Sequence, residues 1–345
     1  MPEIHIRKEG MVGRVTLSRP EALNALTWAM CLEIARALDD WAEDPQVALV
    51  ILDAEGTKAF CAGGDIAEMY RSGIEGDYDY GRSFWRDEYR MNARLAEYPK
   101  PIVSFLHGFV MGGGVGLGGH CSHRIVGESA RIAMPECSIG FVPDVGGTYR
   151  LAQAPGRLGE YLGLTAARME PGDALYAGFA DHFVPEAEWP ALKDALIASG
   201  DAGAVAEAAR AAPHGKLVDW QTQIDLFFGG KELADIVRAL RADGSDFARE
   251  TRAALERNAP LSMAVTLKMI RRLRGPSLTI RDALELEYRV SYRIMEHGDF
   301  LEGIRAAIID KDRQPKWRHA SMEVPEADVD HMLAPLARDA LTFRA

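Results

Sequence analysis

Two acidic residues beside a run of glycines form the part of the sequence best suited to chemistry. Glu136 lies in RIAMPECSIG, and Asp144 follows in GFVPDVGGTYR. Both come shortly after the glycine-rich stretch 111–119, MGGGVGLGG. Glycine exposes backbone N–H groups that can bind a developing oxyanion, and a carboxylate can act as a base or a nucleophile. The combination indicates acyl chemistry.

The glycine stretch has three interpretations on spacing alone. Gly114, Gly116 and Gly119 match a GxGxxG pattern, which would favour a dinucleotide-binding turn. Against this, the glycines begin several residues after the apolar run PIVSFL, and the helix that follows has room for only about two turns. Tight packing of a helix through small residues and an oxyanion or anion site are the other two interpretations. All three stay open at this point.

A second glycine turn, FCAGGDI at 60–66, follows another apolar strand. It could be a plain turn in which Asp65 caps the next helix, or it could supply a second N–H donor facing the first. Oxyanion holes commonly use two such donors, so the two turns together favour that function more than either does alone.

Both carboxylates also have structural interpretations. Pro143-Asp144 readily forms a turn, and Asp144 could cap the chain that follows. Glu136 lies among apolar and small residues, where burial would raise the pKa of a carboxyl group as it does for many general bases. His107, His120 and His123 show no metal-ligand spacing, and we expect no metal site.

The elements that must position these residues alternate between strands and helices. We expect strands in IHIRKEG, VGRVTLSRP, ALVILDAEG, PIVSFLHG, HRIVGES, ARIAMP and FADHFVP, and helices over 24–41, 84–97, 115–123, 159–167 and 171–177. Residues 70–84, YRSGIEGDYDYGRSF, are predicted to be a surface loop. Alternating strands and helices predict an α/β fold.

The pattern changes after residue 185. Residues 189–212 and 231–274 are rich in Ala, Leu, Arg and Glu at helical spacing, with breaks at Pro213-His214-Gly215 and Phe228-Gly229-Gly230. We therefore predict an α/β core over 1–185 and a mainly helical region over 186–345.

Composition excludes several classes of protein. The 40 basic and 51 acidic residues give a net charge of −11, which argues against nucleic acid as a partner. The sequence shows neither a signal peptide nor a membrane-spanning run, so a membrane partner is not expected. The four cysteines lack CxxC spacing and are expected to be free thiols, which predicts a cytoplasmic protein.

Three runs together resemble the crotonase, or enoyl-CoA hydratase/isomerase, superfamily: FCAGGDI, HGFVMGGGVGLGG and MPECSIGFVPDVGGTYRL. The resemblance implies a spiral of ββα units, with a helical C-terminal region completing the site. It implies that the amides of Gly64 and Gly113 form an oxyanion hole for the thioester oxygen of an acyl-CoA. It also implies contacts with CoA or substrate at Ala62, Gly63, Asp65, Ile66 and Gly112. Many relatives are homo-oligomers.

Other matches point to one branch of the superfamily. Hydratases carry a second glutamate on the helix after the glycines, where this chain has Gly116. The GGGVGL, MPE and FVPDVGG combination and the tail EGIRAAIIDKDRQPKWRHA at 302–320 resemble 3-hydroxyisobutyryl-CoA hydrolases. In that tail, Lys311 is a candidate contact for the CoA phosphates, and a solvated charge is the equally good alternative.

The resemblance implies hydrolysis of 3-hydroxyisobutyryl-CoA, or of a similar 3-hydroxyacyl-CoA, to the free acid and CoA in valine degradation. Glu136 would attack the acyl carbon or activate water, and Asp144 would hold the 3-hydroxyl group, orient water or handle the thiolate proton. No cofactor is expected, because CoA is part of the substrate. An enoyl-CoA hydratase or isomerase and a non-catalytic acyl-CoA-binding protein are the alternatives.

Overall fold

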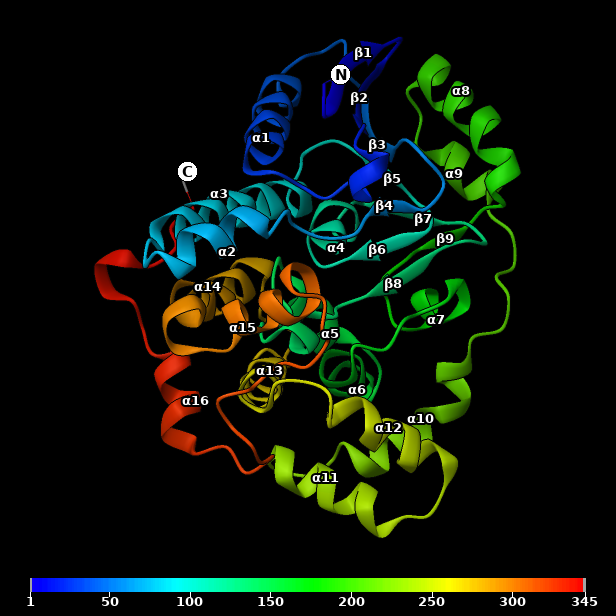
Figure 1. Cartoon of the computed structure of the whole chain (residues 1–345). Helices are drawn as coiled ribbons and strands as arrows, with labels where there is room; N and C mark the ends of the chain where they lie inside the picture. Colours follow the sequence, from blue (N-terminus) through cyan, green and yellow to red (C-terminus); the bar gives the residue numbers. More distant parts are fainter. Residues whose placement is uncertain (1, 344–345) are drawn as a thin grey trace. The chain divides into compact units, whose positions relative to one another are not determined.

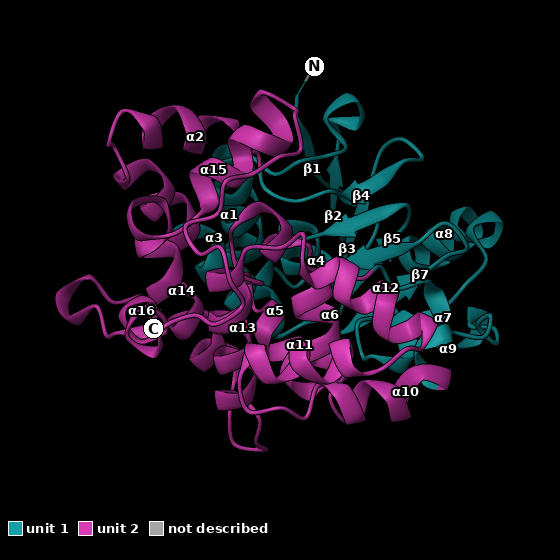
Figure 2. Cartoon of the chain, turned by 60° about the horizontal axis from the view of Figure 1, so that its bottom comes forward, with its two compact units in different colours: residues 1–64, 87–133, 168–218 teal, residues 65–86, 134–167, 219–345 magenta. Residues whose placement is uncertain are grey.

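The computed structural model describes residues 2–343, whose contacts divide the chain into two compact units (Figure 2). Unit 1 contains the chain up to Gly64, Asp87–Ala133 and Arg168–Val218. Unit 2 contains Asp65–Arg86, Met134–Ala167 and the chain from Asp219 onward. Each unit therefore combines stretches that are far apart in the sequence.

Unit 1 contains two sheets (Figure 1). The larger has the order β1-β2-β3-β5-β7-β9, and all its pairings except β1 with β2 are parallel. Its strands are β1 (Ile4–Glu9), β2 (Val12–Leu17), β3 (Leu49–Ala54), β5 (Ile102–Leu106), β7 (His123–Val126) and β9 (His182–Phe183). The smaller sheet is parallel, with the order β4-β6-β8: β4 (Ala59–Cys61), β6 (Phe109–Met111) and β8 (Arg131–Ala133).

The strands after β2 come in consecutive pairs. In each of β3–β4, β5–β6 and β7–β8, the first strand joins the larger sheet and the second joins the smaller one. Each pair therefore advances by one position along both sheets, which is the spiral of ββ units expected from the sequence. Because parallel strands share their direction, the carboxyl ends of β4, β6 and β8 lie at the same edge of the small sheet. The residues that follow these strands are the ones that matter for the site.

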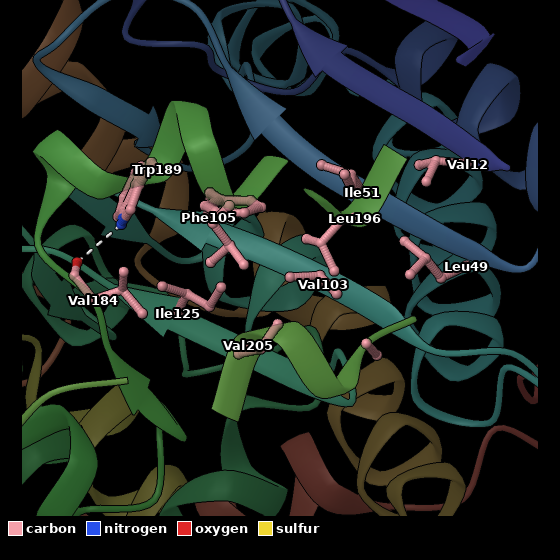
Figure 3. Packing of buried hydrophobic residues seen from close by; sticks show 12 residues of the cluster. Val12, Leu49, Ile51, Val103, Phe105, Ile125, Val184, Trp189, Leu196 and Val205 are labelled. Carbon is pink, nitrogen blue, oxygen red and sulfur yellow. Dashed lines mark hydrogen bonds between the residues drawn. The ribbon is translucent and has the colours of Figure 1, made fainter. Parts of the chain in front are cut away.

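Apolar residues bury one face of the larger sheet (Figure 3). The sequence LVILDA of β3 is buried over its first five residues, as expected for a central parallel strand. Side chains of α8 (Trp189–Ser199) and α9 (Gly203–Ala208) pack on this sheet, and the Trp189 indole N–H donates to the Val184 carbonyl oxygen at 2.9 Å. Unit 1 also contains η1 (Pro20–Ala22), α1 (Trp28–Ala42), α4 (Gly113–Gly118), α7 (Pro171–Tyr176) and η3 (Glu186–Glu188).

The described part of unit 2 is built from helices and irregular segments. They are α2 (Ala67–Ile74), η2 (Glu136–Ile139), α5 (Gly147–Gln153), α6 (Leu158–Thr165), α11 (Leu233–Ala242), α12 (Asp246–Leu255), α13 (Pro260–Arg272), α14 (Ile280–His297), α15 (Phe300–Ile304), the π-helical turn η4 (Arg305–Ile309), α16 (Glu326–Leu333) and η5 (Ala337–Asp339). Along the chain, α3 (Asp79–Ala96) and α10 (Lys216–Phe227) pass from one unit to the other.

Most predicted elements are present. Strands occur only before residue 185 in the described chain, and helices follow, with breaks between α9 and α10 and between α10 and α11 where glycine and proline predicted them. The predicted boundary at 185 marks this change along the sequence, whereas each compact unit draws on stretches from both sides of it.

The predicted loop over 70–84 is correct only for residues 75–78, and the rest of the range is helical. Helix α2 extends to Ile74, and α3 begins at Asp79, where the Asp77 side chain accepts a hydrogen bond from the Asp79 amide at 3.1 Å. The helices were not recognised in the sequence because Gly73 and Gly81 look like turn residues. A Cβ on Gly73 would lie 2.6 Å from a methyl carbon of Leu301, so this glycine serves close helix packing rather than a turn.

Candidate active site

Two glycine turns meet in unit 1. Ala62–Gly64 follows β4, and Gly112-Gly113 follows β6, at the same edge of the small sheet. A Cβ placed on Gly113 would lie 3.2 Å from the Gly64 amide nitrogen. Gly113 begins α4, and the first amides of a helix have no partner within the helix. The structure thus brings together the two residues predicted to form the oxyanion hole.

Both turns require glycine for a conformational reason. The φ angles of Gly63 and Gly112 are +117° and +50°, in the region that favours glycine. The packing interpretation of the glycine stretch is correct, because a Cβ on Gly114 would lie 2.1 Å from the Cys61 carbonyl oxygen. Close packing of α4 on β4 therefore fixes the separation of the two glycine turns.

An acidic residue of unit 1 lies beside these glycines. Glu88 of α3 is 3 % exposed, and its Oε1 would lie 3.1 Å from a Cβ on Gly113. This oxygen has no hydrogen-bond partner among the described residues. Burial raises the pKa of Glu88 well above its usual range, so its carboxyl group favours the protonated form. Such a group can donate a hydrogen bond to a molecule bound over Gly113.

The sequence alone did not identify Glu88. It lies in the segment SFWRDEYRMN, which supported the family resemblance only as a stretch. Helical spacing made it one of several charged residues on a helix with an exposed face. The signal that distinguishes it is burial without a partner, and burial depends on the packing of α3 rather than on neighbouring residues.

In unit 2, Glu136 begins the short helix η2. Its side chain is buried, and Oε2 has no hydrogen-bond partner within the described chain. Burial is the main cause that raises the pKa of Glu136, and the charge of Glu287 raises it further. The sequence predicted this buried, pKa-shifted carboxyl group.

Close backbone contacts hold the segment that carries Glu136. A Cβ on Gly303 of α15 would lie 2.0 Å from the Ile139 carbonyl oxygen, and the Ala259 amide donates to the Cys137 carbonyl oxygen at 2.9 Å. The rings of Phe141 and Phe300 also pack together, with centroids 4.7 Å apart. The Glu136 backbone therefore has little freedom to move.

Asp144 lies in a tight turn, and its residue is buried as well. Its carbonyl oxygen accepts a hydrogen bond from the Gly147 amide at 2.6 Å. The two central residues, Val145 and Gly146, have φ angles of +53° and +79°, the signs of a type I′ turn. The turn interpretation is thus correct for the Asp144 backbone, and the Asp144 residue is also buried.

The remaining predicted residues contribute local structure. The Ala62 amide donates to the Leu23 carbonyl oxygen at 3.0 Å, and Ile66 precedes the first residue of α2. Asp65 is half-buried. Lys311 is exposed with a φ of +57°, in a loop where Arg305 pairs with acidic neighbours. By unit, Gly64, Gly113, Ala62, Gly63 and Gly112 lie in unit 1, and Glu136, Asp144, Asp65, Ile66 and Lys311 lie in unit 2.

Parallel sheets built from repeated ββ pairs, with two adjacent glycine turns at their edge, are the features of a crotonase-fold protein. The model of the family described as enoyl-CoA hydratase/isomerase matches residues 12–333, and the chain belongs to this family. Curated relatives named 3-hydroxyisobutyryl-CoA hydrolase, mitochondrial, are similar over nearly their whole length. The proteins from Gallus gallus and Homo sapiens are each 36 % identical to this chain, covering 98 % and 99 % of it and 90 % and 91 % of the relatives.

Solved structures are similar over the whole chain as well. A protein described as an enoyl-CoA hydratase from Rhodobacter sphaeroides is 58 % identical, with a TM-score of 0.95 over 99 % of this chain and 100 % of that one. A protein described as a carnitinyl-CoA dehydratase from Mycobacterium thermoresistibile is 42 % identical, with a TM-score of 0.95 and full coverage of both chains. The fold predicted from the sequence is therefore confirmed.

Proposed function

We propose that this protein hydrolyses 3-hydroxyisobutyryl-CoA, or a similar 3-hydroxyacyl-CoA, to the free acid and CoA. The observation that carries the proposal is the buried Glu136 carboxyl group, whose Oε2 has no hydrogen-bond partner among the described residues, in a chain whose α4 has Gly116 instead of a second glutamate. The relatives named as hydrolases support this substrate. Water addition to a double bond would need a second acid or base at Gly116, whereas thioester cleavage needs one.

In the proposed reaction, the amides of Gly64 and Gly113 bind the thioester carbonyl oxygen. The Glu136 carboxylate removes a proton from water as the water oxygen attacks the acyl carbon, and negative charge develops on the carbonyl oxygen. The two amides stabilise that charge, each contributing about 3 kcal/mol to the transition state. The tetrahedral intermediate then collapses, the C–S bond breaks, and the CoA thiolate takes up the proton held by Glu136.

A covalent route uses the same groups. Glu136 would attack the acyl carbon itself, releasing CoA thiolate and leaving a mixed anhydride that water cleaves. Single turnover in ¹⁸O-labelled water tests the covalent route. Label in the Glu136 side chain supports an anhydride opened at the protein carbonyl, whereas label only in the product acid excludes that opening and is the result expected for activated water.

Asp144 and Glu88 supply polar groups for the 3-hydroxyacyl part of the substrate. Asp144 would accept a hydrogen bond from the 3-hydroxyl group or orient water. Glu88, protonated because burial raises its pKa, would donate a hydrogen bond to a substrate atom near Gly113. An ionised Glu88 would repel the oxyanion, so its protonated form is the active one in this account.

Hydration of an enoyl-CoA is the second candidate, favoured by the description of the 58 % identical structure as an enoyl-CoA hydratase. A panel of thioesters distinguishes the candidates. Release of free CoA from 3-hydroxyacyl thioesters is the expected result for the wild-type protein. Conversion of crotonyl-CoA without CoA release would favour the hydratase, and binding without any turnover would favour a non-catalytic acyl-CoA-binding protein.

Carboxyl groups and backbone amides suffice for this hydrolysis, so we propose no cofactor beyond the CoA of the substrate. Lys311, Asp65 and Ile66 remain candidate contacts for CoA. Valine degradation is the proposed pathway, and assembly into a homo-oligomer is retained as a prediction. Cytoplasmic location also stays a prediction, since the relatives are named as mitochondrial proteins.

A further inference from the structure

A buried carboxylate from α14 binds the turn that carries Asp144. Glu287 is 0 % exposed, and its Oε2 accepts a hydrogen bond from the Gly146 amide at 2.8 Å. Its Oε1 accepts from the Thr148 amide at 3.0 Å and also from the Thr148 hydroxyl group. One side chain, more than a hundred positions along the chain from the turn, therefore satisfies three donors of this segment.

The turn needs such support because its backbone is strained. Val145 has a φ of +53°, a conformation that β-branched residues avoid. The hydrogen bond from the Gly147 amide to the Asp144 carbonyl oxygen closes the turn but binds neither the Gly146 amide nor the Thr148 amide. A strained backbone persists only where surrounding contacts fix it, and it is concentrated at functional sites.

Satisfying these donors with an ionisable residue costs free energy, because burial disfavours the charged carboxylate and raises the pKa of Glu287 to about 7. A carboxylate, however, offers acceptors on both oxygens in one plane and can accept from all three donors without presenting a donor of its own. A glutamine in the same place would direct an N–H group at the Gly146 amide or at the Thr148 amide. The geometry thus selects a carboxyl side chain.

We propose that Glu287 is a positioning residue that holds the 144–148 segment in its strained turn, so that Asp144 is presented to the acyl group. The proposal rests on the thioester hydrolysis proposed above. Glu287 acts on Asp144 through the backbone of the turn, and its charge also raises the pKa of Glu136. Loss of its acceptors releases the turn, and Asp144 then loses its orientation.

The test uses three variants of the full chain. Glu287→Gln leaves a backbone donor without an acceptor, and Thr148→Val removes only the hydroxyl group while keeping the size of the side chain. Glu285→Gln is the matched control, because Glu285 is an exposed residue two positions away on the same helix. For each variant we would measure kcat for CoA release, the dissociation constant for CoA, and hydrogen exchange of the Gly146 and Thr148 amides.

We expect Glu287→Gln to expose these amides to exchange and to lower kcat by about 10- to 100-fold, the loss typical of a misplaced catalytic group. Affinity for CoA should be unchanged, since the turn contributes to the acyl step only. Thr148→Val should also lower kcat, but by a smaller factor. Glu285→Gln should match the wild type in every measurement.

The proposal is overturned if Glu287→Gln exposes the amides and leaves kcat unchanged, or if the amides stay protected. If Glu287→Gln does not fold, Thr148→Val decides the question: a lower kcat supports the proposal, and an unchanged kcat overturns it. A wild-type protein that releases no CoA contradicts the proposed function instead. In that case the exchange data still report whether Glu287 holds the turn, so the two failures are distinguishable.

Discussion

At the scale of single residues, the proposed chemistry and its positioning depend on three of the buried glutamates. Glu88, Glu136 and Glu287 are each at most 5 % exposed, and burial raises the pKa of each carboxyl group. Taking a charge out of water disfavours its ionised form, so each proton is held to a higher pH than on an exposed glutamate. In the proposed reaction, Glu136 must lose this proton to act, whereas Glu88 must keep it.

These opposite requirements predict a bell-shaped pH dependence of kcat/KM. Activity rises with pH as Glu136 ionises and falls again as Glu88 ionises, both limbs lying above the range of exposed carboxyl groups. Glu88→Gln keeps a neutral hydrogen-bond donor that cannot ionise, so the alkaline fall should disappear and the acid limb should remain. Rates of CoA release between pH 5 and pH 10 test this.

Glu97→Gln, at an exposed position just after α3, should leave both limbs in place. An alkaline limb that persists in Glu88→Gln would show that another group causes it and would remove Glu88 from the account. A rate that is flat across neutral pH in the wild type would contradict the ionisation of Glu136 as the acid limb.

At the scale of elements, glycine packing sets the distance between the two proposed oxyanion donors, Gly64 and Gly113. Helix α4 lies so close to β4 that a Cβ at Gly114 would meet the Cys61 carbonyl oxygen at 2.1 Å. A backbone oxygen cannot rotate away as a side chain can. Any side chain at Gly114 must therefore displace α4, and Gly113 at its start moves with it.

We predict that Gly114→Ala lowers kcat by about 100-fold, since losing one oxyanion donor typically has an effect of this size. Overpacking should also reduce stability by about 1–3 kcal/mol. Steady-state kinetics and thermal unfolding would measure the two effects. Gly244→Ala is the control, because a Cβ there meets no atom within 4 Å. A Gly114→Ala variant with wild-type kcat would show that α4 does not set the oxyanion donors.

The sequence predicted elements and motifs better than it predicted which residues contact each other in the folded chain. Buried strands such as 49–54 and the paired glycine turns were identifiable, because their signals are local: a continuous apolar run, and glycine at a strand end. Glu136 was found through its apolar surroundings in the sequence. Glu88 and Glu287 were missed, because each becomes distinctive only when a helix packs against a segment remote in the chain. The helical residues of 70–84 were missed because Gly73 and Gly81 look like turn formers.

At the scale of the whole molecule, each unit carries part of the proposed machinery. Gly64, Gly113 and Glu88 belong to unit 1, and Glu136, Asp144 and Glu287 belong to unit 2. No helix within residues 2–343 has the length and apolar content needed to cross a membrane. The four cysteines are distributed over both units, and all are buried free thiols.

The native protein should therefore resist thiol reagents. Burial raises the pKa of Cys31, Cys61 and Cys137, so few thiolates form at neutral pH. Iodoacetamide should leave CoA release unchanged over a period in which the denatured chain is fully alkylated. A colorimetric thiol reagent should detect four thiols only after denaturation. Rapid loss of activity with modification of one cysteine would point to a cysteine nucleophile.

The central claim is that Glu136 drives the cleavage of a 3-hydroxyacyl-CoA thioester. The most direct test compares CoA release from 3-hydroxyisobutyryl-CoA by the wild-type protein and by Glu136→Gln, with CoA binding measured by calorimetry in both. We predict that the substitution lowers kcat by about 1,000-fold or more and leaves CoA affinity unchanged, because Glu136 acts on the acyl carbon and not on the nucleotide. A Glu136→Gln variant that retains substantial hydrolysis would contradict the account.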